Sequence, residues 1–134
     1  MKVKVIIERG ADNFYSAYMD DDRFDFGLNA QGDTVQDAKE KFFIVYNELQ
    51  EMKEEEGKKV PIIEFEFEYD IDSFLNYYAG VLSKSGLEKI TGINQKQLWH
   101  YASGHRKPTK NTILKIQKGL HKFAEELRQV QFVD

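Results

Sequence analysis

The chain has 134 residues and a formal net charge of −4, with 41% hydrophobic and 13% aromatic residues and no cysteine. That length suits one domain or two small ones, and the composition is that of a folded globular protein. The absence of cysteine excludes a disulfide framework and any cysteine-ligated zinc site, and it fits a reducing compartment.

The start of the chain, residues 3–8, is too short and too charged to predict a signal peptide. No run approaches the roughly 20 apolar residues of a membrane helix. We therefore expect a cytoplasmic protein with no membrane partner.

Charge is spread unevenly along the chain. Residues 1–71 carry nine basic and eighteen acidic side chains, whereas residues 72–134 carry ten and five, so the halves have net charges of −9 and +5. Such an asymmetry indicates two surfaces with two kinds of partner. The basic half suits nucleic acid, and the acidic half suits a basic protein or simply keeps the chain in solution.

The first half opens with strand patterns. Residues 2–8 alternate apolar and polar side chains, as a half-buried strand does, and residues 10–13 have turn chemistry. Residues 14–19 predict a second strand that forms a hairpin with the first. After the acidic loop 20–22, residues 24–28, extending toward Ala30, predict a third strand that closes at Gly32.

A long helix and a fourth strand follow. Thr34, with Asp37 three residues later, resembles a capping box, and the helix runs to about Glu56 before Gly57 stops it. Its apolar stripe comprises Val35, Ala38, Phe42, Val45, Tyr46, Leu49 and Met52. Residues 63–71 alternate apolar and acidic side chains without a break. The fold class predicted for residues 1–71 is therefore β-β-β-α-β, with one sheet and the helix packed across it.

Residues 72–134 predict an all-α domain. A first helix, capped by Asp72 or Ser73, buries Leu75, Tyr78, Ala79 and Leu82. A pair of short helices then meets at Gly92-Ile93-Asn94, and Asn94 caps the second of them. That second helix covers about residues 95–103, has Leu98 and Tyr101 on its buried face, and ends at Gly104.

The last helix begins at Asn111 or Thr109. Its apolar stripe comprises Ile113, Ile116, Leu120, Phe123, Ala124 and Leu127. The stripe and the residues after it, Val130, Phe132 and Val133, extend beyond what a minimal domain of this kind needs. They form either a dimer surface or the end of a monomeric core.

The spacing from Gly92 to Pro108 resembles the helix-turn-helix of the phage-repressor (XRE-like) family. The matching positions are Gly92-Ile93-Asn94-Gln95, Leu98, Tyr101, Gly104 and Arg106-Lys107-Pro108. The resemblance implies double-stranded DNA as a partner, with base contacts from Gln95, Lys96, Gln97 and His100. It implies phosphate contacts from Arg106, Lys107 and Lys110. Glu88 stands where the family usually has a small residue, so either the helices cross more widely or Glu88 tilts outward.

The distribution of charge favours a DNA-binding domain over a helical bundle that does not bind DNA. Residues 83–124 carry nine basic side chains and one acidic one, and such a basic face supplies non-specific DNA affinity. Trp99 can stack on DNA or pack against the loop 104–108, and packing is the prediction because lone tryptophans are mostly buried. Repressors of this class bind as dimers, so we expect a homodimer or a higher homo-oligomer.

The first half resembles the HicB-type antitoxins. Residues 27–38 match that family's pattern of a strand ending in glycine, then Gly32-Asp33-Thr34 opening a helix with Asp37 and Ala38 soon after. The family has the same order of elements, with a partial ribonuclease-H-like sheet, and many members append a DNA-binding domain. Phe26 and Leu28 replace a proline and a cysteine that are frequent there. The resemblance implies a type II antitoxin that neutralises a small basic mRNA-cleaving toxin of the HicA type and represses its own promoter.

Two other functions stay open. A ribonuclease-H-like fold can host a two-metal nuclease, for which the candidate carboxylates are Glu8, Asp20, Asp25, Asp33 and Asp37. Most of these lie in predicted loops or caps, and the histidines show no metal spacing, so we expect no enzyme, no catalytic residue, no metal and no cofactor. A regulator without a toxin would keep the DNA-binding half and use the sheet for dimerisation or a ligand. The toxin-binding residues cannot be named from the sequence.

Overall fold

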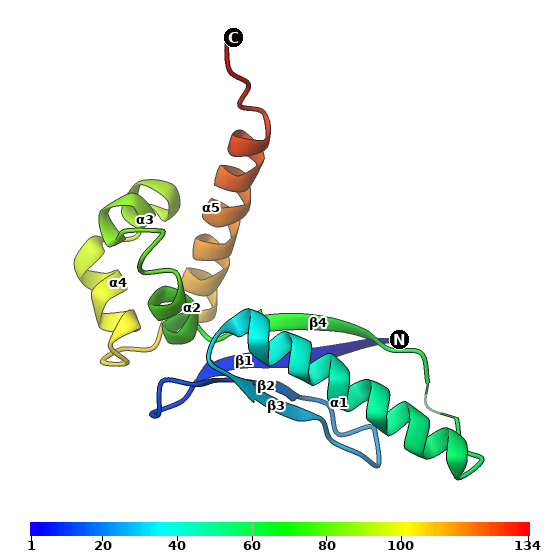
Figure 1. Ribbon diagram of the computed structural model, residues 1–134. Coiled ribbons are helices and arrows are strands. Elements are labelled where there is room, and N and C mark those ends of the chain that lie inside the picture. Colours follow the sequence, from blue (N-terminus) through cyan, green and yellow to red (C-terminus); the bar gives the residue numbers. More distant parts are fainter. Residues whose placement is uncertain (60) are drawn as a thin grey trace. The chain divides into compact units, whose positions relative to one another are not determined.

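The computed structural model describes residues 1–59 and 61–134. The chain divides into two compact units, Met1–Ser73 (unit 1) and Phe74–Asp134 (unit 2), as the colours of Figure 1 allow the reader to follow. Over the described residues the architecture is mixed α and β, with one four-stranded sheet and five helices. The division falls two residues after the boundary expected from the sequence.

Unit 1 is a sheet covered by one helix. Its elements are β1 (Lys2–Arg9), β2 (Tyr15–Met19), β3 (Asn29–Gly32), α1 (Val35–Glu55) and β4 (Glu64–Tyr69). In its described residues the strand order is β3-β2-β1-β4. β1 runs antiparallel to β2 and parallel to β4, so the predicted hairpin and the predicted single sheet are confirmed. Figure 1 shows α1 lying along one face of that sheet.

The core of unit 1 follows from the alternation in β1. Val3, Val5 and Ile7 are almost fully buried, because strand side chains two residues apart share a face. Phe42 of α1 is 0% exposed and packs edge-to-face against Phe65 of β4, with ring centroids 5.0 Å apart. The Thr34 hydroxyl accepts a hydrogen bond from the Asp37 backbone N–H at 3.0 Å and fixes the start of α1, as predicted.

The third strand was predicted too early. Residues 24–28 are not a strand, and β3 begins at Asn29, which pairs with Tyr18. The carboxylate of Asp21 accepts hydrogen bonds from both the backbone and the guanidinium of Arg23, which turns the chain just after β2. The residues up to Leu28 therefore form a loop, and pairing resumes only with the hydrogen bond from the Met19 N–H to the Leu28 carbonyl, 2.9 Å.

The predicted stripe of α1 also extended too far. Met52 is exposed, although Val35, Ala38, Phe42 and Tyr46 are buried. A helix of 21 residues is about 30 Å long, whereas a strand of six residues spans about 20 Å. The last turns of α1 therefore run past the sheet, as Figure 1 shows, and have no strand to cover.

Asp70, directly after β4, gives unit 1 a pH-dependent stability. Its Oδ1 atom is buried and has no hydrogen-bond partner among the described residues. Burial, followed by the nearby carboxyl groups of Asp72 and Glu8, raises the pKa of Asp70 from 3.8 to about 6. The folded state thus binds this proton more tightly than the unfolded state. The resulting stabilisation is complete below pH 4 and is lost as the pH rises to 6 and above.

Asp70→Asn is therefore expected to stabilise unit 1 at pH 7. We expect a gain of roughly 1 kcal/mol in the free energy of unfolding, because the half-exposed carboxylate is partly screened by water. Urea denaturation at pH 7 and at pH 4 measures it. The gain should nearly vanish at pH 4, and an equal gain at both pH values would contradict this account.

Unit 2 is built from the end of α2 (Ile71–Tyr77) and from α3 (Lys84–Thr91), α4 (Gln95–Ala102) and α5 (Lys110–Arg128). Its buried apolar side chains are Leu75, Leu87, Leu98, Tyr101 and Ile116. Asn94 and Thr109, expected at the starts of α4 and α5, each accept a backbone N–H there, and Ser83, which was not predicted, does the same for α3. The predicted cap of the first helix is wrong, because α2 begins at Ile71 and both Asp72 and Ser73 lie inside it. Ala79, predicted to be buried, is exposed because α2 ends at Tyr77.

α5 approaches α3 closely at Gly119. A Cβ atom at this position would lie 2.6 Å from the carbonyl oxygen of Ile90 and 2.9 Å from the Cα of Thr91. Only glycine permits this contact. The end of α5 projects beyond the shorter α3 (Figure 1), so Leu127, predicted to face the core, is exposed, and Ala124 is exposed as well. Ile113, near the start of α5, is also partly exposed.

Over the residues described, no helix combines the length and the apolar character needed to cross a membrane.

Candidate nucleic-acid interface

The N-terminus of α4 is capped from two sides. The Asn94 side chain accepts the Lys96 N–H at 2.8 Å, and Oε1 of Glu88 accepts the Gln95 N–H at 2.9 Å. Glu88 therefore reaches from α3 to the start of α4 and caps it. Two of the backbone donors at this helix end, the N–H groups of Gln95 and Lys96, are therefore already used inside the chain.

The turn between α3 and α4 is fixed by hydrogen bonds and by one left-handed residue. Gly92 has φ of +75°, a conformation that favours glycine. The hydroxyl of Thr91 donates to the Leu87 carbonyl at 2.7 Å and accepts from the Ile93 N–H at 3.1 Å. These bonds set the direction in which α4 leaves the turn.

A groove of about 550 Å³ gathers four of the seven predicted contact residues. Its lining includes Lys96, Gln97 and His100 of α4 together with Arg106 of the following loop. Arg106 reaches this place because its backbone N–H donates to the His100 carbonyl at 3.2 Å, which folds the loop back against the end of α4. Gln95, Lys107 and Lys110 are exposed and do not line the groove.

Gln97 is held inside the unit. Its Nε2 donates to the hydroxyl of Tyr101 at 3.0 Å. Tyr101 is buried, so this bond anchors Gln97 to the core side of α4. Among the predicted base contacts, Gln97 is therefore the one whose amide donor already has a partner.

His100 sits between two aromatic rings. Its centroid is 5.5 Å from that of Trp99 and 5.0 Å from that of His105. Burial, and then the positive charges of His105, Arg106 and Lys96, lower its pKa below the usual value. These effects therefore favour the neutral form of the ring. Its Nδ1 atom is buried and lacks a hydrogen-bond partner in the described part of the chain, which leaves Nε2 as the nitrogen for an outside contact.

Trp99 was predicted to pack against the loop, and that prediction is wrong. Its side chain is 56% exposed. Leu98 and Tyr101 point into the core, and a helix turns by about 100° per residue, so Trp99 lies on the flank of α4. With His100, Ser103, Gly104 and His105 it lines a second hollow of about 510 Å³.

Three further residues belong to this surface and were not predicted. Thr112, in the first turn of α5, lines the groove, and His105 lines the second hollow. The Lys115 ammonium lies beside Gly92, 3.6 Å from where a Cβ would stand. Lys115 follows Thr112 by three residues, so both side chains lie on the same face of α5. This helical spacing is the sequence signal that could have identified Lys115.

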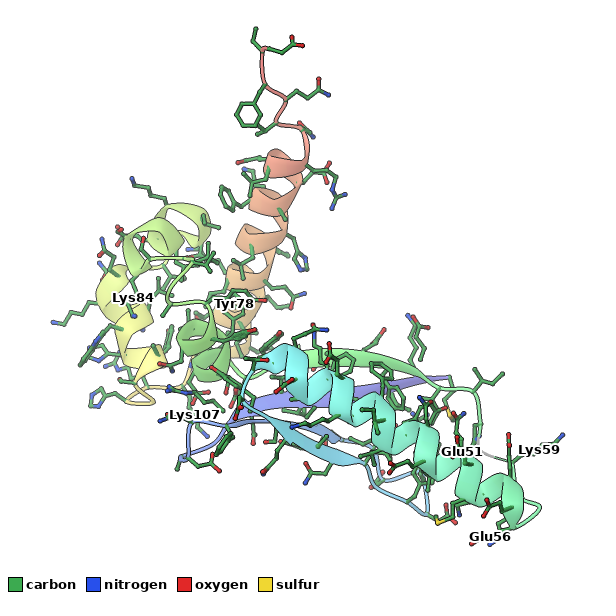
Figure 2. All side chains as sticks on the ribbon, viewed as in Figure 1. Glu51, Glu56, Lys59, Tyr78, Lys84 and Lys107 are labelled. Carbon is green, nitrogen blue, oxygen red and sulfur yellow. The ribbon has the colours of Figure 1, made fainter. Side chains whose placement is uncertain are left out.

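The remaining basic side chains stand outside the groove. Figure 2 shows Lys107 on the loop between α4 and α5, and Lys84 at the start of α3. Both Lys107 and Lys110 are exposed, as phosphate-contacting residues must be. The groove and the exposed lysines Lys107 and Lys110 thus belong to the same unit.

Within the described residues, no three histidine, aspartate or glutamate side chains form a group that could hold a metal ion. No protein-family model, no curated protein and no solved structure matches this chain.

Proposed function

We propose that the chain is a HicB-type antitoxin. In this proposal unit 2 is a helix-turn-helix domain that binds promoter DNA, and unit 1 binds and neutralises a small basic mRNA-cleaving toxin. Neither unit acts as an enzyme, and the protein works as a homodimer in the cytoplasm.

The groove beside α4 is the observation that carries the DNA-binding half of the proposal. Lys96, His100 and Arg106 come from two segments and line it together, and all three side chains can donate hydrogen bonds to base edges or phosphates. α4 is short, capped and preceded by a tight turn, which is the form of a recognition helix that enters the major groove.

Lys96→Ala is expected to lower specific affinity for the promoter by roughly 1–3 kcal/mol, with a smaller loss on random DNA, because a base contact is removed. Fluorescence anisotropy with DNA from upstream of the chain's own gene measures both. Lys118→Ala, which removes the same charge from an exposed position on α5, is the matched control. Equal losses from Lys96→Ala on promoter and random DNA would show that Lys96 does not read bases.

Lys107→Ala is expected to behave differently. An exposed lysine that contacts a phosphate supplies affinity on any sequence, so the loss should be equal on promoter and random DNA. The slope of log K against log salt concentration should fall by about one. An unchanged slope would remove Lys107 from the interface.

Unit 1 supports the second half of the proposal by its charge and its order of elements. It bears an exposed acidic row, Glu64, Glu66 and Glu68, on the face of β4 opposite α1. A basic RNA-binding protein would find complementary charge there. The β-β-β-α-β order agrees with the antitoxin resemblance drawn from residues 27–38.

The proposal is tested by purifying the tagged full-length chain from its native cells with whatever remains bound. We expect a small basic protein that is lost when residues 1–71 are deleted and that cleaves RNA when alone. Recovery of promoter DNA without a protein partner would instead favour a regulator that has no toxin.

A further inference from the structure

β4 is one of the two edge strands in the sheet of unit 1. In the described residues the sheet order is β3-β2-β1-β4, so β4 has a neighbour on one side only. Its register with β1 is parallel, with Lys2 opposite Glu64, Val3 opposite Phe65 and Val5 opposite Phe67. An edge strand presents backbone groups that another strand can pair with.

The hydrogen bonds show which backbone groups point outward. The Glu64 N–H donates to the Met1 carbonyl at 2.8 Å, so Glu64 faces β1. In a parallel ladder, alternate residues bond to the same neighbour, and Glu66 and Glu68 therefore face β1 too. The N–H and C=O groups of Phe65 and Phe67 are directed to the open edge.

The side chains at this edge differ between the two faces of the sheet. On the α1 face, Phe43 is 42% exposed and packs on the half-buried rings of Phe65 and Phe67, with centroids 6.0 and 5.8 Å away. On the opposite face, Glu64, Glu66 and Glu68 are exposed. The edge thus carries aromatic rings on one side, where the Lys39 ammonium lies 5.0 Å from the Phe67 ring centroid, and carboxylates on the other.

A second copy of β4 does not fit this edge. Pairing two β4 strands side by side would place one row of glutamates next to another on the same face, and like charges on neighbouring strands are destabilising. The two ion pairs on this face, Lys2 with Glu66 at 3.2 Å and Lys4 with Glu68 at 3.4 Å, are exposed and weak. Glu64 belongs to neither of these pairs.

We propose that β4 takes an added strand from a basic protein, in which apolar and basic side chains alternate. Its backbone pairs with Phe65 and Phe67, its apolar side chains pack beside Phe43, and its basic side chains lie along Glu64, Glu66 and Glu68. Successive side chains of a strand point to opposite faces of a sheet, so one such strand places its apolar groups on the α1 face and its basic groups on the acidic face. This inference rests on the proposed function in one respect, namely that unit 1 binds a basic protein.

The test uses the full-length, isotope-labelled chain and a capped seven-residue peptide in which lysine and valine alternate. We expect the amide protons of Phe65 and Phe67 to exchange more slowly with solvent when the peptide is bound. The amides of Glu66 and Glu68 already bond to β1 and serve as internal controls, so their exchange should not change. Protection of all four amides alike, or of none, would overturn the proposal.

Two further peptides separate strand addition from simple charge attraction. A peptide of the same composition with its valines and lysines in separate blocks should bind at least about fivefold more weakly, because it cannot match both faces. A peptide in which glutamate and valine alternate should not bind. Equal binding by the alternating and the block lysine peptides would mean that charge alone attracts them, which would overturn the proposal.

Variants of the chain locate the site. Glu64→Gln should weaken the lysine–valine peptide about threefold at low salt, and Phe43→Ala should weaken it by a similar factor. Glu51→Gln, on the exposed surface of α1 (Figure 2), removes the same charge elsewhere and should have no effect. Equal weakening by Glu51→Gln and Glu64→Gln would overturn the proposed site.

Failure of strand addition at β4 and failure of the antitoxin proposal would give different results. If a basic toxin is recovered from cells but leaves the exchange of the Phe65 and Phe67 amides unchanged, the antitoxin function stands and strand addition at β4 is wrong. If the peptide protects these amides but no toxin is recovered, the β4 site stands and the antitoxin function is wrong.

Discussion

Phe42→Ala is expected to lower the free energy of unfolding of unit 1 by about 3–5 kcal/mol, the cost of emptying a buried aromatic site. The Phe42 ring is fully buried and meets three other rings, those of Phe43, Phe65 and Phe67, at centroid distances of 5.0 to 6.0 Å. The rings of Phe65 and Phe67 come from β4, so the cavity would loosen the contact between α1 and the edge strand. Domains have only about 5–15 kcal/mol of stability, so a large part of it would be lost.

Phe43→Ala is the matched control. Phe43 is the next residue of α1 and contacts the same rings of β4, but it is 42% exposed. We expect a loss of about 1 kcal/mol, because little new cavity is formed. Urea denaturation followed by the amide signals of unit 1 measures both variants. Equal losses would mean that the core does not centre on Phe42.

Gly119→Ala is expected to destabilise unit 2 by about 1–3 kcal/mol or more, although alanine is the better helix former by about 1 kcal/mol. The added methyl group would meet backbone atoms of Ile90 and Thr91 at 2.6 and 2.9 Å, and backbone cannot move aside as a side chain can. α5 would have to shift away from α3. Because Thr91 also holds the turn before α4, we expect affinity for DNA to fall with stability.

The control for Gly119 is the same substitution at Gly80. Nothing lies within 4 Å of the Cβ position at Gly80, and its φ is not positive, so Gly80→Ala should leave stability within about 0.5 kcal/mol of the wild type. Thermal unfolding followed by the fluorescence of Trp99, the one tryptophan of the sequence and part of unit 2, measures both variants. Stabilisation by Gly119→Ala would show that the α3–α5 contact is looser than the distances indicate.

Local patterns predicted the elements of this chain well where one face of an element is buried. The alternation in β1 and β4, the stripe at the start of α1 and the caps Thr34, Asn94 and Thr109 are all confirmed, because each depends on neighbouring residues alone. The third strand failed because residues 24–28 have a strand-like pattern but no strand opposite them. Pairing is a property of the sheet, and the sequence pattern does not contain it.

The predictions for the candidate site divide in the same way, into those made from the sequence and those that depend on packing. Lys96 and His100 were named from the resemblance to the phage-repressor family, and the groove does bring them together. The placement of Arg106 beside His100 depends on a hydrogen bond between backbone atoms, which no side-chain pattern reports. The reach of Glu88 to α4 and the exposure of Trp99 depend on how α3 and α4 pack, so they too required the structure.

The parallel pairing of β1 with β4 has a consequence for biosynthesis. β1 lies inside the sheet and leaves the ribosome before the other strands of unit 1, but its partner on one side, residues Glu64–Tyr69, is the last of these strands to be made. Until then the nascent chain can form only the β1–β2 hairpin, β3 and α1, with the β4 side of β1 uncovered. Folding of unit 1 must therefore wait for β4, since contacts between distant residues form late.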